Sequence, residues 1–145
     1  RDNTIDKWFL ETLGVWVSTL NKCEYCIEHH FAGLKRLLND DEKATQIRSA
    51  IDTNKIEEAP LENCQKTAME YARKLTHNPG SIREESIEKL RADGYTDGEI
   101  LEINQVCAYF SYANRTVLGL GCSTKGDILG LSPNNNDDPN DWGHS

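Results

Sequence analysis

The sequence predicts an all-α protein, and three observations lead to this prediction. Apolar residues recur at the 3.6-residue helical period in successive segments of the chain. No segment of the sequence shows the sustained alternation of apolar and polar residues that is typical of a half-buried strand. Serine or threonine stands three residues before glutamate, a helix start signal, at Ser81 with Glu84 and at Thr96 with Glu99.

The first two helices are predicted over residues 4–20 and 22–38. Asn21 lies between them and is expected to cap the second helix. The stripe of the first helix consists of Ile5, Phe9, Leu13, Trp16 and Leu20, widened by Trp8, Val15 and Val17. The apolar face of the second consists of Cys23, Cys26, Ile27, His30, Phe31, Leu34, Leu37 and Leu38. A shorter helix is expected over residues 42–51.

Proline, glycine and helix-capping residues divide the rest of the chain into segments. Pro60 ends a polar linker, and an apolar stripe from Leu61 to Leu75 predicts the next helix. Ser81 and Glu84 predict a short helix that ends near Gly94. The longest helix is expected over residues 97–118, with Asn114 in its apolar stripe as a structural amide that needs hydrogen-bond partners.

Composition limits the possible partners. The 145 residues include 16 Lys and Arg and 24 Asp and Glu, which gives a net charge of −8. An acidic surface argues against nucleic acid and anionic membrane as partners, and no apolar run approaches the roughly 20 residues of a membrane span. The length fits one helical domain, predicted over residues 1–122, followed by a polar tail over residues 123–145.

The five cysteines, at positions 23, 26, 64, 107 and 122, indicate the compartment. An odd number in a chain of this length favours a reducing, cytoplasmic setting with one specialised pair over a secreted disulfide framework. No signal peptide or transit segment is visible. The chain begins at Arg1, which indicates either removal of an upstream segment or a numbering that starts inside a longer protein.

The segment that indicates chemistry is Cys23-Glu24-Tyr25-Cys26-Ile27-Glu28-His29-His30. On a helix, Cys23, Cys26 and His30 share one face about a turn apart, and cysteines three residues apart are within disulfide range. The positive end of the helix dipole favours a thiolate there. A histidine can accept and return a proton near neutral pH, and Glu11 on the preceding helix is a candidate to orient it.

Other interpretations of these residues compete with a redox site. Cys23, Cys26, His30 and Glu11 are also a possible four-ligand zinc site, although no second pair of ligands follows. Cys64, Cys107 and Cys122 are interpreted as small core residues. His29, His77 and His144 are interpreted as surface or tail histidines outside the site.

At these residues the sequence resembles the AhpD-like alkylhydroperoxidases of the carboxymuconolactone decarboxylase superfamily. The resemblance lies in Glu11, eleven intervening residues, Cys23-x-x-Cys26, three more residues and His30. It covers residues 5–121. Later segments that resemble the family, and its peroxidase-related branch in particular, are AMEYARKLT at 68–76, LRADGYTDGEI at 90–100, AYFSYANR at 108–115 and GLG at 119–121.

The resemblance implies an all-α bundle that forms homo-oligomers, as trimers or hexamers. It implies peroxide reduction in which the Cys26 thiolate attacks the peroxide, Cys23 closes a disulfide, and Glu11 and His30 relay the proton. An external dithiol or thiol adaptor protein resets the pair, and no metal, haem or flavin cofactor is required. Decarboxylase members lack the cysteine pair, so lactone decarboxylation is not expected. The competing hypotheses are a redox-sensing or disulfide-exchange adaptor and a zinc-stabilised interaction domain.

Overall fold

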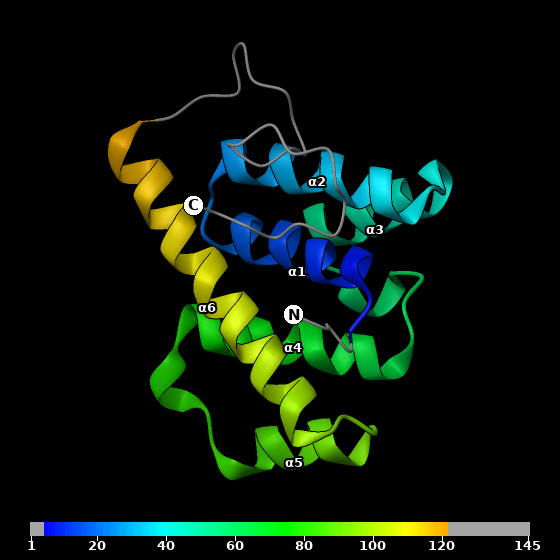
Figure 1. Cartoon of the computed structure of the whole chain (residues 1–145), viewed down its shortest axis with the longest axis vertical. Helices are drawn as coiled ribbons and strands as arrows, with labels where there is room; N and C mark the ends of the chain where they lie inside the picture. Colours follow the sequence, from blue (N-terminus) through cyan, green and yellow to red (C-terminus); the bar gives the residue numbers. More distant parts are fainter. Residues whose placement is uncertain (1–4, 122–145) are drawn as a thin grey trace.

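In the computed structural model, which describes residues 5–121, a central helix is surrounded by the other helices (Figure 1). The described residues contain no strand, so the predicted all-α class is confirmed. Central helix α1 contacts α2, α3, α4 and α6. The elements are α1 (Lys7–Leu20), α2 (Glu24–Leu38), α3 (Asp41–Asp52), the 3-10 turn η1 (Ile56–Glu58), α4 (Asn63–His77), the 3-10 turn η2 (Pro79–Ser81), α5 (Glu84–Ala92) and α6 (Asp97–Leu120).

Helix α1 is buried on nearly every side, more than its predicted stripe implies. From Thr12 to Ser18 every residue is buried, because neighbouring helices cover each face. The Trp16 indole, 1% exposed, donates a hydrogen bond of 2.8 Å to the Met69 carbonyl on α4. A helix enclosed in this way forms the centre of a core, so side chains on α1 are held rigidly.

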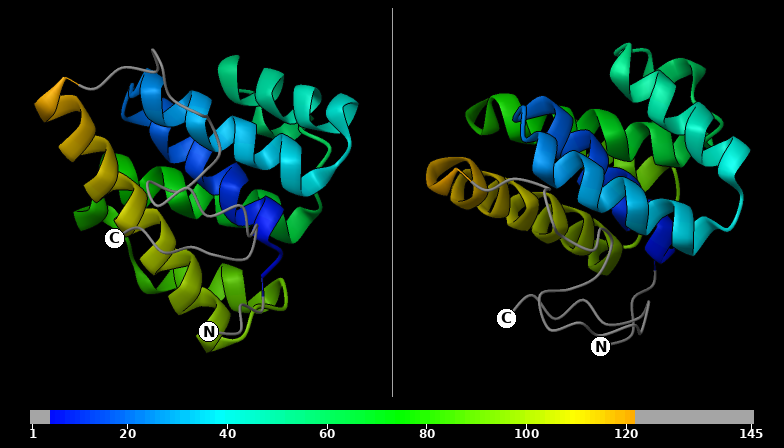
Figure 2. Two further views of the ribbon diagram at one scale, coloured as in Figure 1. Left: turned by 45° about the horizontal axis from the view of Figure 1, so that its top comes forward. Right: turned by 90° about the horizontal axis from the view of Figure 1, so that it is seen from above.

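The turn between α1 and α2 differs from the prediction. Asn21 ends α1 and Cys23 is the N-cap of α2, so the prediction that Asn21 caps α2 is wrong. The amide of Asn21 is used elsewhere, since it donates to Asn114 Oδ1 on α6 at 3.0 Å. Lys22 makes the tight turn with φ at +59°. Helices α1 and α2 therefore lie side by side (Figure 2).

One of the two predicted capping boxes forms. Thr96 Oγ1 accepts the Glu99 N–H at 3.1 Å, and the Glu99 carboxylate accepts the Thr96 N–H at 2.9 Å. The box predicted at Ser81 is wrong, because Ser81 lies in η2 and its hydroxyl donates to the Asn78 carbonyl at 2.7 Å. Helix α5 begins three residues later, at Glu84.

The buried amide of Asn114 is a structural group, as predicted. It is fully buried on α6, donates to Ser18 Oγ at 3.0 Å and accepts from Asn21. These bonds fasten the end of α1 to α6, which fixes the position of the turn that precedes α2. Within residues 5–121 no helix is long and apolar enough to cross a membrane. The predicted tail, residues 123–145, lies outside the described residues, so the domain boundary stays a prediction.

Replacing Asn114 by leucine is expected to lower the free energy of unfolding by about 1–3 kcal/mol, because it leaves the buried Ser18 hydroxyl without its amide partner and removes one of the hydrogen bonds of Asn21. Urea unfolding followed by circular dichroism measures the change. Exposed Thr116→Ala on the same helix is the control and should stay within about 0.5 kcal/mol of the wild type. An equal effect of both substitutions would contradict a specific role for the amide.

Candidate active site

Two cysteines lie at the N-terminus of α2. Cys23 and Cys26 form a disulfide with their Cα atoms 5.3 Å apart. Cys23 is the N-cap rather than a residue of the helix, and its Sγ accepts the Cys26 N–H at 3.4 Å. The sulfur of Cys23 therefore occupies the place of an ordinary capping oxygen. A sulfur at this position interacts with the positive end of the helix dipole.

The two sulfur-bearing residues differ slightly in burial. Cys23 has no exposed surface, whereas Cys26 is 5% exposed. A reagent from solution therefore meets Cys26 first. When the disulfide is open, the Cys23 sulfur lies at the positive end of the α2 dipole, where a negative charge is favoured.

The predicted partnership of Glu11 and His30 is present. Glu11 on α1 lies 2.7 Å from His30 on α2, measured from Oε2 to Nδ1. Their side chains are 13% and 9% exposed, respectively. With the carboxylate ionised, Nδ1–H donates to Glu11, and Nε2 is the ring nitrogen left to exchange a proton. We call these two residues the relay.

The relay is one helical turn from the cysteine pair. His30 follows Cys26 by four residues on α2, a spacing that puts their Cβ atoms about 5–6 Å apart on one face. The Phe110 ring of α6 packs edge-on against the His30 ring, with centroids 4.6 Å apart. The structure thus groups all four predicted site residues, Glu11, Cys23, Cys26 and His30, around the contact of α1 with α2.

Sequence reasoning missed two glycines beside the relay. Gly14 on α1 lies against the His30 ring, and Gly33 on α2 lies against the Glu11 carboxylate. The available signal was a glycine inside each helical pattern, which usually has a packing or functional reason. Sequence reasoning also did not place Phe110 beside His30, because a sequence does not show which helix covers a site.

The other cysteines lie away from these four residues. Cys107 is buried, as predicted, and burial raises the pKa of its thiol to about 12, so it stays protonated at neutral pH. Cys64 is only half-buried and its Sγ donates to Glu62, so its prediction as a core residue is wrong. Cys122 lies outside the described residues.

The other described histidines lie outside the Glu11–His30 hydrogen bond. His29, predicted at the surface, is half-buried; its ring stacks on Tyr25, with centroids 6.0 Å apart, and meets the His30 ring edge-on at 5.9 Å. His77, the last residue of α4, is exposed, as predicted. His144 lies outside the described residues.

In the described part of the chain no three His, Cys, Asp or Glu side chains are grouped to hold a metal ion, so the zinc hypothesis finds no support there.

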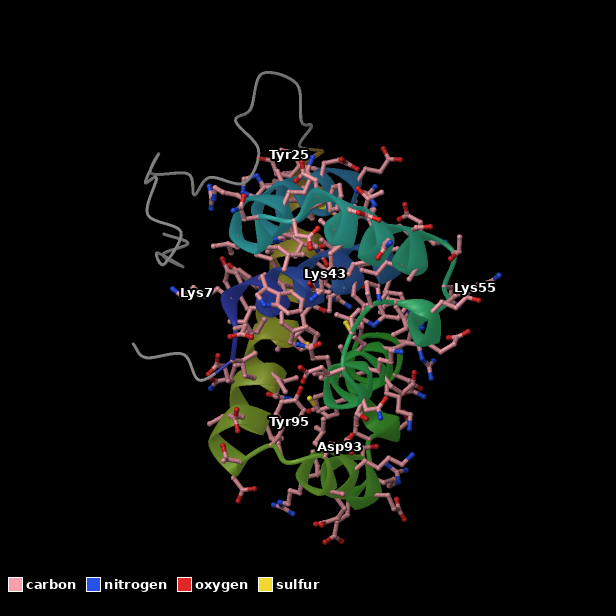
Figure 3. All side chains as sticks on the ribbon, turned by 90° about the vertical axis from the view of Figure 1, so that its right-hand side faces the viewer. Lys7, Tyr25, Lys43, Lys55, Asp93 and Tyr95 are labelled. Carbon is pink, nitrogen blue, oxygen red and sulfur yellow. A yellow bond between two sulfur atoms is a disulfide. The ribbon has the colours of Figure 1, made fainter. Side chains whose placement is uncertain are left out.

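A surface pocket of about 490 Å³ opens between α4 and α5, with Lys74, Lys89 and Asp93 in its lining. Asp93 lies at the opposite end of the molecule from Tyr25, which precedes Cys26 (Figure 3). The pocket is therefore remote from the cysteines.

Solved structures of the same fold are known. An uncharacterized peroxidase-related protein from Silicibacter sp. TM1040 matches with a TM-score of 0.75 at 28% identity, over 84% of this chain and 61% of that one. The alkylhydroperoxidase AhpD core of an uncharacterized peroxidase-related protein from Ralstonia eutropha JMP134 matches with a TM-score of 0.73 at 25% identity, over 82% and 60%. This chain therefore spans about three fifths of each.

Comparison of folds finds similar proteins that comparison with family models and curated sequences does not. No protein-family model matches the sequence, and no curated protein matches it. The fold is nevertheless shared over more than four fifths of this chain with two proteins described as peroxidase-related, at 25% and 28% identity. The chain therefore has the fold of these AhpD-like, peroxidase-related proteins and is similar to them in sequence.

Proposed function

We propose that the protein is a thiol-dependent peroxidase that reduces hydroperoxides through a Cys23–Cys26 dithiol and disulfide cycle. The observation that carries this proposal is the hydrogen-bonded Glu11–His30 pair, shielded from solvent and one helical turn from the cysteines. A thiol needs a base to become a nucleophile, and the departing alkoxide needs an acid. A histidine oriented by a carboxylate supplies both from one position.

In the oxidative half of the cycle, Cys26 gives its proton to His30 Nε2 and its sulfur attacks the O–O bond. The bond breaks, Cys26 becomes a sulfenic acid, and the departing alkoxide takes the proton from His30 to leave as an alcohol. Cys23 then attacks the sulfenic sulfur, which forms the disulfide and releases water. Two electrons pass from the two thiols to the peroxide. The greater exposure of Cys26 supports its role as the attacking sulfur.

In the reductive half, an external dithiol or thiol adaptor protein attacks the disulfide. Attack on the more accessible Cys26 sulfur gives a mixed disulfide and expels Cys23 as a thiolate. The Cys26 N–H, which already points at Cys23 Sγ, stabilises that leaving group. A second thiol of the reductant then frees Cys26. A metal, haem or flavin has no step in this cycle.

Assembly and location are part of the proposal. Members of the superfamily suggest a homo-oligomer, a trimer or a hexamer, working in the cytoplasm with a peroxide as substrate. The acidic net charge of −8 argues against nucleic acid and membrane surfaces as partners.

Stopped-flow oxidation of the reduced protein tests the function directly. Cumene hydroperoxide and hydrogen peroxide are mixed with it separately, and the state of Cys23 and Cys26 is read by mass spectrometry. Rapid, saturable formation of one Cys23–Cys26 disulfide is expected, and the rates rank the two peroxides. Oxidation no faster than that of a free thiol of matching pKa would contradict a peroxidase. The redox-sensing or disulfide-exchange adaptor would then be the better hypothesis.

Replacing Cys23 by serine is expected to stop the cycle after its first step. Because no second thiol can condense with it, the sulfenic acid on Cys26 should accumulate after one equivalent of peroxide and should be trapped by dimedone. Peptide mass spectrometry locates the adduct. In Cys64→Ser, the control, the Cys23–Cys26 disulfide should form and no adduct should remain. Full wild-type turnover by the Cys23→Ser protein would contradict the resolving role of Cys23.

A further inference from the structure

Helices α1 and α2 each present a glycine to the relay side chain of the other. A Cβ added to Gly14 would lie 2.9 Å from Cγ and 3.1 Å from Nδ1 of His30. A Cβ added to Gly33 would lie 3.0 Å from both Cδ and Oε1 of Glu11. Carbon atoms in contact normally lie about 3.5–4.0 Å apart. An alanine at position 14 therefore requires the His30 ring to shift, and an alanine at position 33 requires the Glu11 carboxylate to move by a few tenths of an ångström.

The two contacts are reciprocal. Glu11 precedes Gly14 by three residues on α1, and His30 precedes Gly33 by three residues on α2. Residues three apart share a face of a helix, so each helix turns one relay group and one glycine toward its neighbour. Glu11 consequently rests on Gly33, while His30 rests on Gly14.

The relay side chains have little room to retreat. The His30 ring packs against Phe110 as well as Gly14, and the Phe110 Cζ atom would itself lie 3.1 Å from a Cβ on Gly14. A methyl group at position 14 therefore displaces the imidazole from Nδ1 contact with Glu11. A methyl group at position 33 displaces the carboxylate from the other side.

We propose that Gly14 and Gly33 are positioning residues of the relay. They let the backbones of α1 and α2 approach closely enough for Glu11 and His30 to meet at 2.7 Å. A glycine weakens the interior of a helix relative to alanine, so each of the two glycines lowers the local stability of its helix. The expected kinetic effect rests on the proposed peroxidase function, whereas the geometric claim does not.

The first experiment compares Gly14→Ala and Gly33→Ala with a matched glycine. Gly119→Ala in α6 is the control, because an added Cβ there has no neighbour within 4 Å. Both relay variants should slow disulfide formation by cumene hydroperoxide about 10- to 100-fold and alter its pH profile. The Gly119→Ala protein should form the disulfide at a rate within about twofold of that of the wild type. Wild-type rates and pH profiles in both relay variants would overturn the proposal.

A second measurement needs no peroxide turnover. The oxidised wild-type protein, labelled with ¹⁵N-histidine, should give a downfield Nδ1–H resonance from the hydrogen bond of His30 to Glu11. Gly33→Ala should shift or abolish this resonance, and Gly119→Ala should not. An unchanged resonance in folded Gly33→Ala would overturn the positioning role. A changed resonance in a protein without peroxidase activity would uphold the positioning role and refute only the proposed function.

A double substitution distinguishes positioning from general damage. In a Glu11→Gln background, Gly33→Ala should slow oxidation less than about twofold further, because its effect acts through the carboxylate. An equal slowing in both backgrounds would overturn the proposal.

If Gly33→Ala does not fold, Gly33→Ala with Glu11→Asp provides the test. The shorter carboxylate clears the methyl group, so this pair should recover the thermal unfolding temperature of Glu11→Asp alone. Failure to recover it would overturn the proposal.

Discussion

Replacing Cys26 by serine is expected to abolish catalytic peroxide reduction, leaving only the background rate of the reductant. The hydroxyl is a far poorer nucleophile than a thiolate, and the residue keeps nearly the same size at its 5% exposed position. Loss of hydroperoxide in the presence of excess dithiothreitol, followed by a ferrous xylenol orange assay, measures the effect.

The control for this substitution is Cys64→Ser, which removes a half-buried thiol on α4 and should keep the wild-type rate. Circular dichroism checks that both variants remain helical. Turnover by the Cys26→Ser protein above background would contradict the assignment of Cys26 as the attacking sulfur. Equal losses in Cys26→Ser and Cys64→Ser would indicate a reaction that does not depend on the cysteine pair.

Replacing His30 by alanine is expected to slow the oxidation of Cys26 by about 10²–10⁴-fold, the usual contribution of a general acid and base. The variant loses the nitrogen that accepts the thiol proton and returns it to the alkoxide. It also leaves the Glu11 carboxylate, 13% exposed, without its partner at 2.7 Å. Single-turnover stopped-flow oxidation by cumene hydroperoxide measures the rate.

Two further variants separate proton transfer from packing. His30→Asn keeps an N–H donor near Glu11 but has no basic nitrogen, so it should fold well and remain slow. His29→Ala removes the adjacent histidine, whose ring stacks on Tyr25 and meets the edge of the His30 ring but does not take part in the bond to Glu11, and should change the rate less than about threefold. A change below about threefold for His30→Ala itself would indicate that His30 is only a core histidine.

The functional face of α2 was predictable because its determinants are local. Cys26 and His30 share a face through helical periodicity alone, and the same rule places Cys23 beside them whether it is the cap or the first helical residue. The start of α6 was predictable for a similar reason, since Thr96 and Glu99 cap the helix with their own side chains. A contact predicted between residues a few positions apart in the sequence is found in the structure when no distant group competes for the same atoms.

Some failures are local, since the Ser81 hydroxyl donates to the Asn78 carbonyl and Cys23 takes the N-cap position predicted for Asn21. Other features depend on distant groups, such as the bond from the Asn21 amide to Asn114, ninety-three residues away. The roles of Gly14 and Gly33 depend on the separation of two helices, which no single helical pattern encodes. The orientation of Glu11 toward His30 likewise does not follow from either helix alone, because it depends on the rotation of α1 relative to α2.

The position of the centre in the chain has a consequence for the order in which the protein is made. All four proposed catalytic residues lie within residues 11–30, and their contacts close only short loops. The ring that packs against His30 comes from Phe110, which is synthesised eighty residues later. A nascent chain, which emerges N-terminus first, therefore contains Cys23, Cys26 and His30 before it contains the ring that packs on the histidine. The proposed catalytic residues and the ring that packs on His30 thus lie in separate segments of the chain. A substitution in α6 can therefore change access to His30 while the sequences of α1 and α2 stay the same.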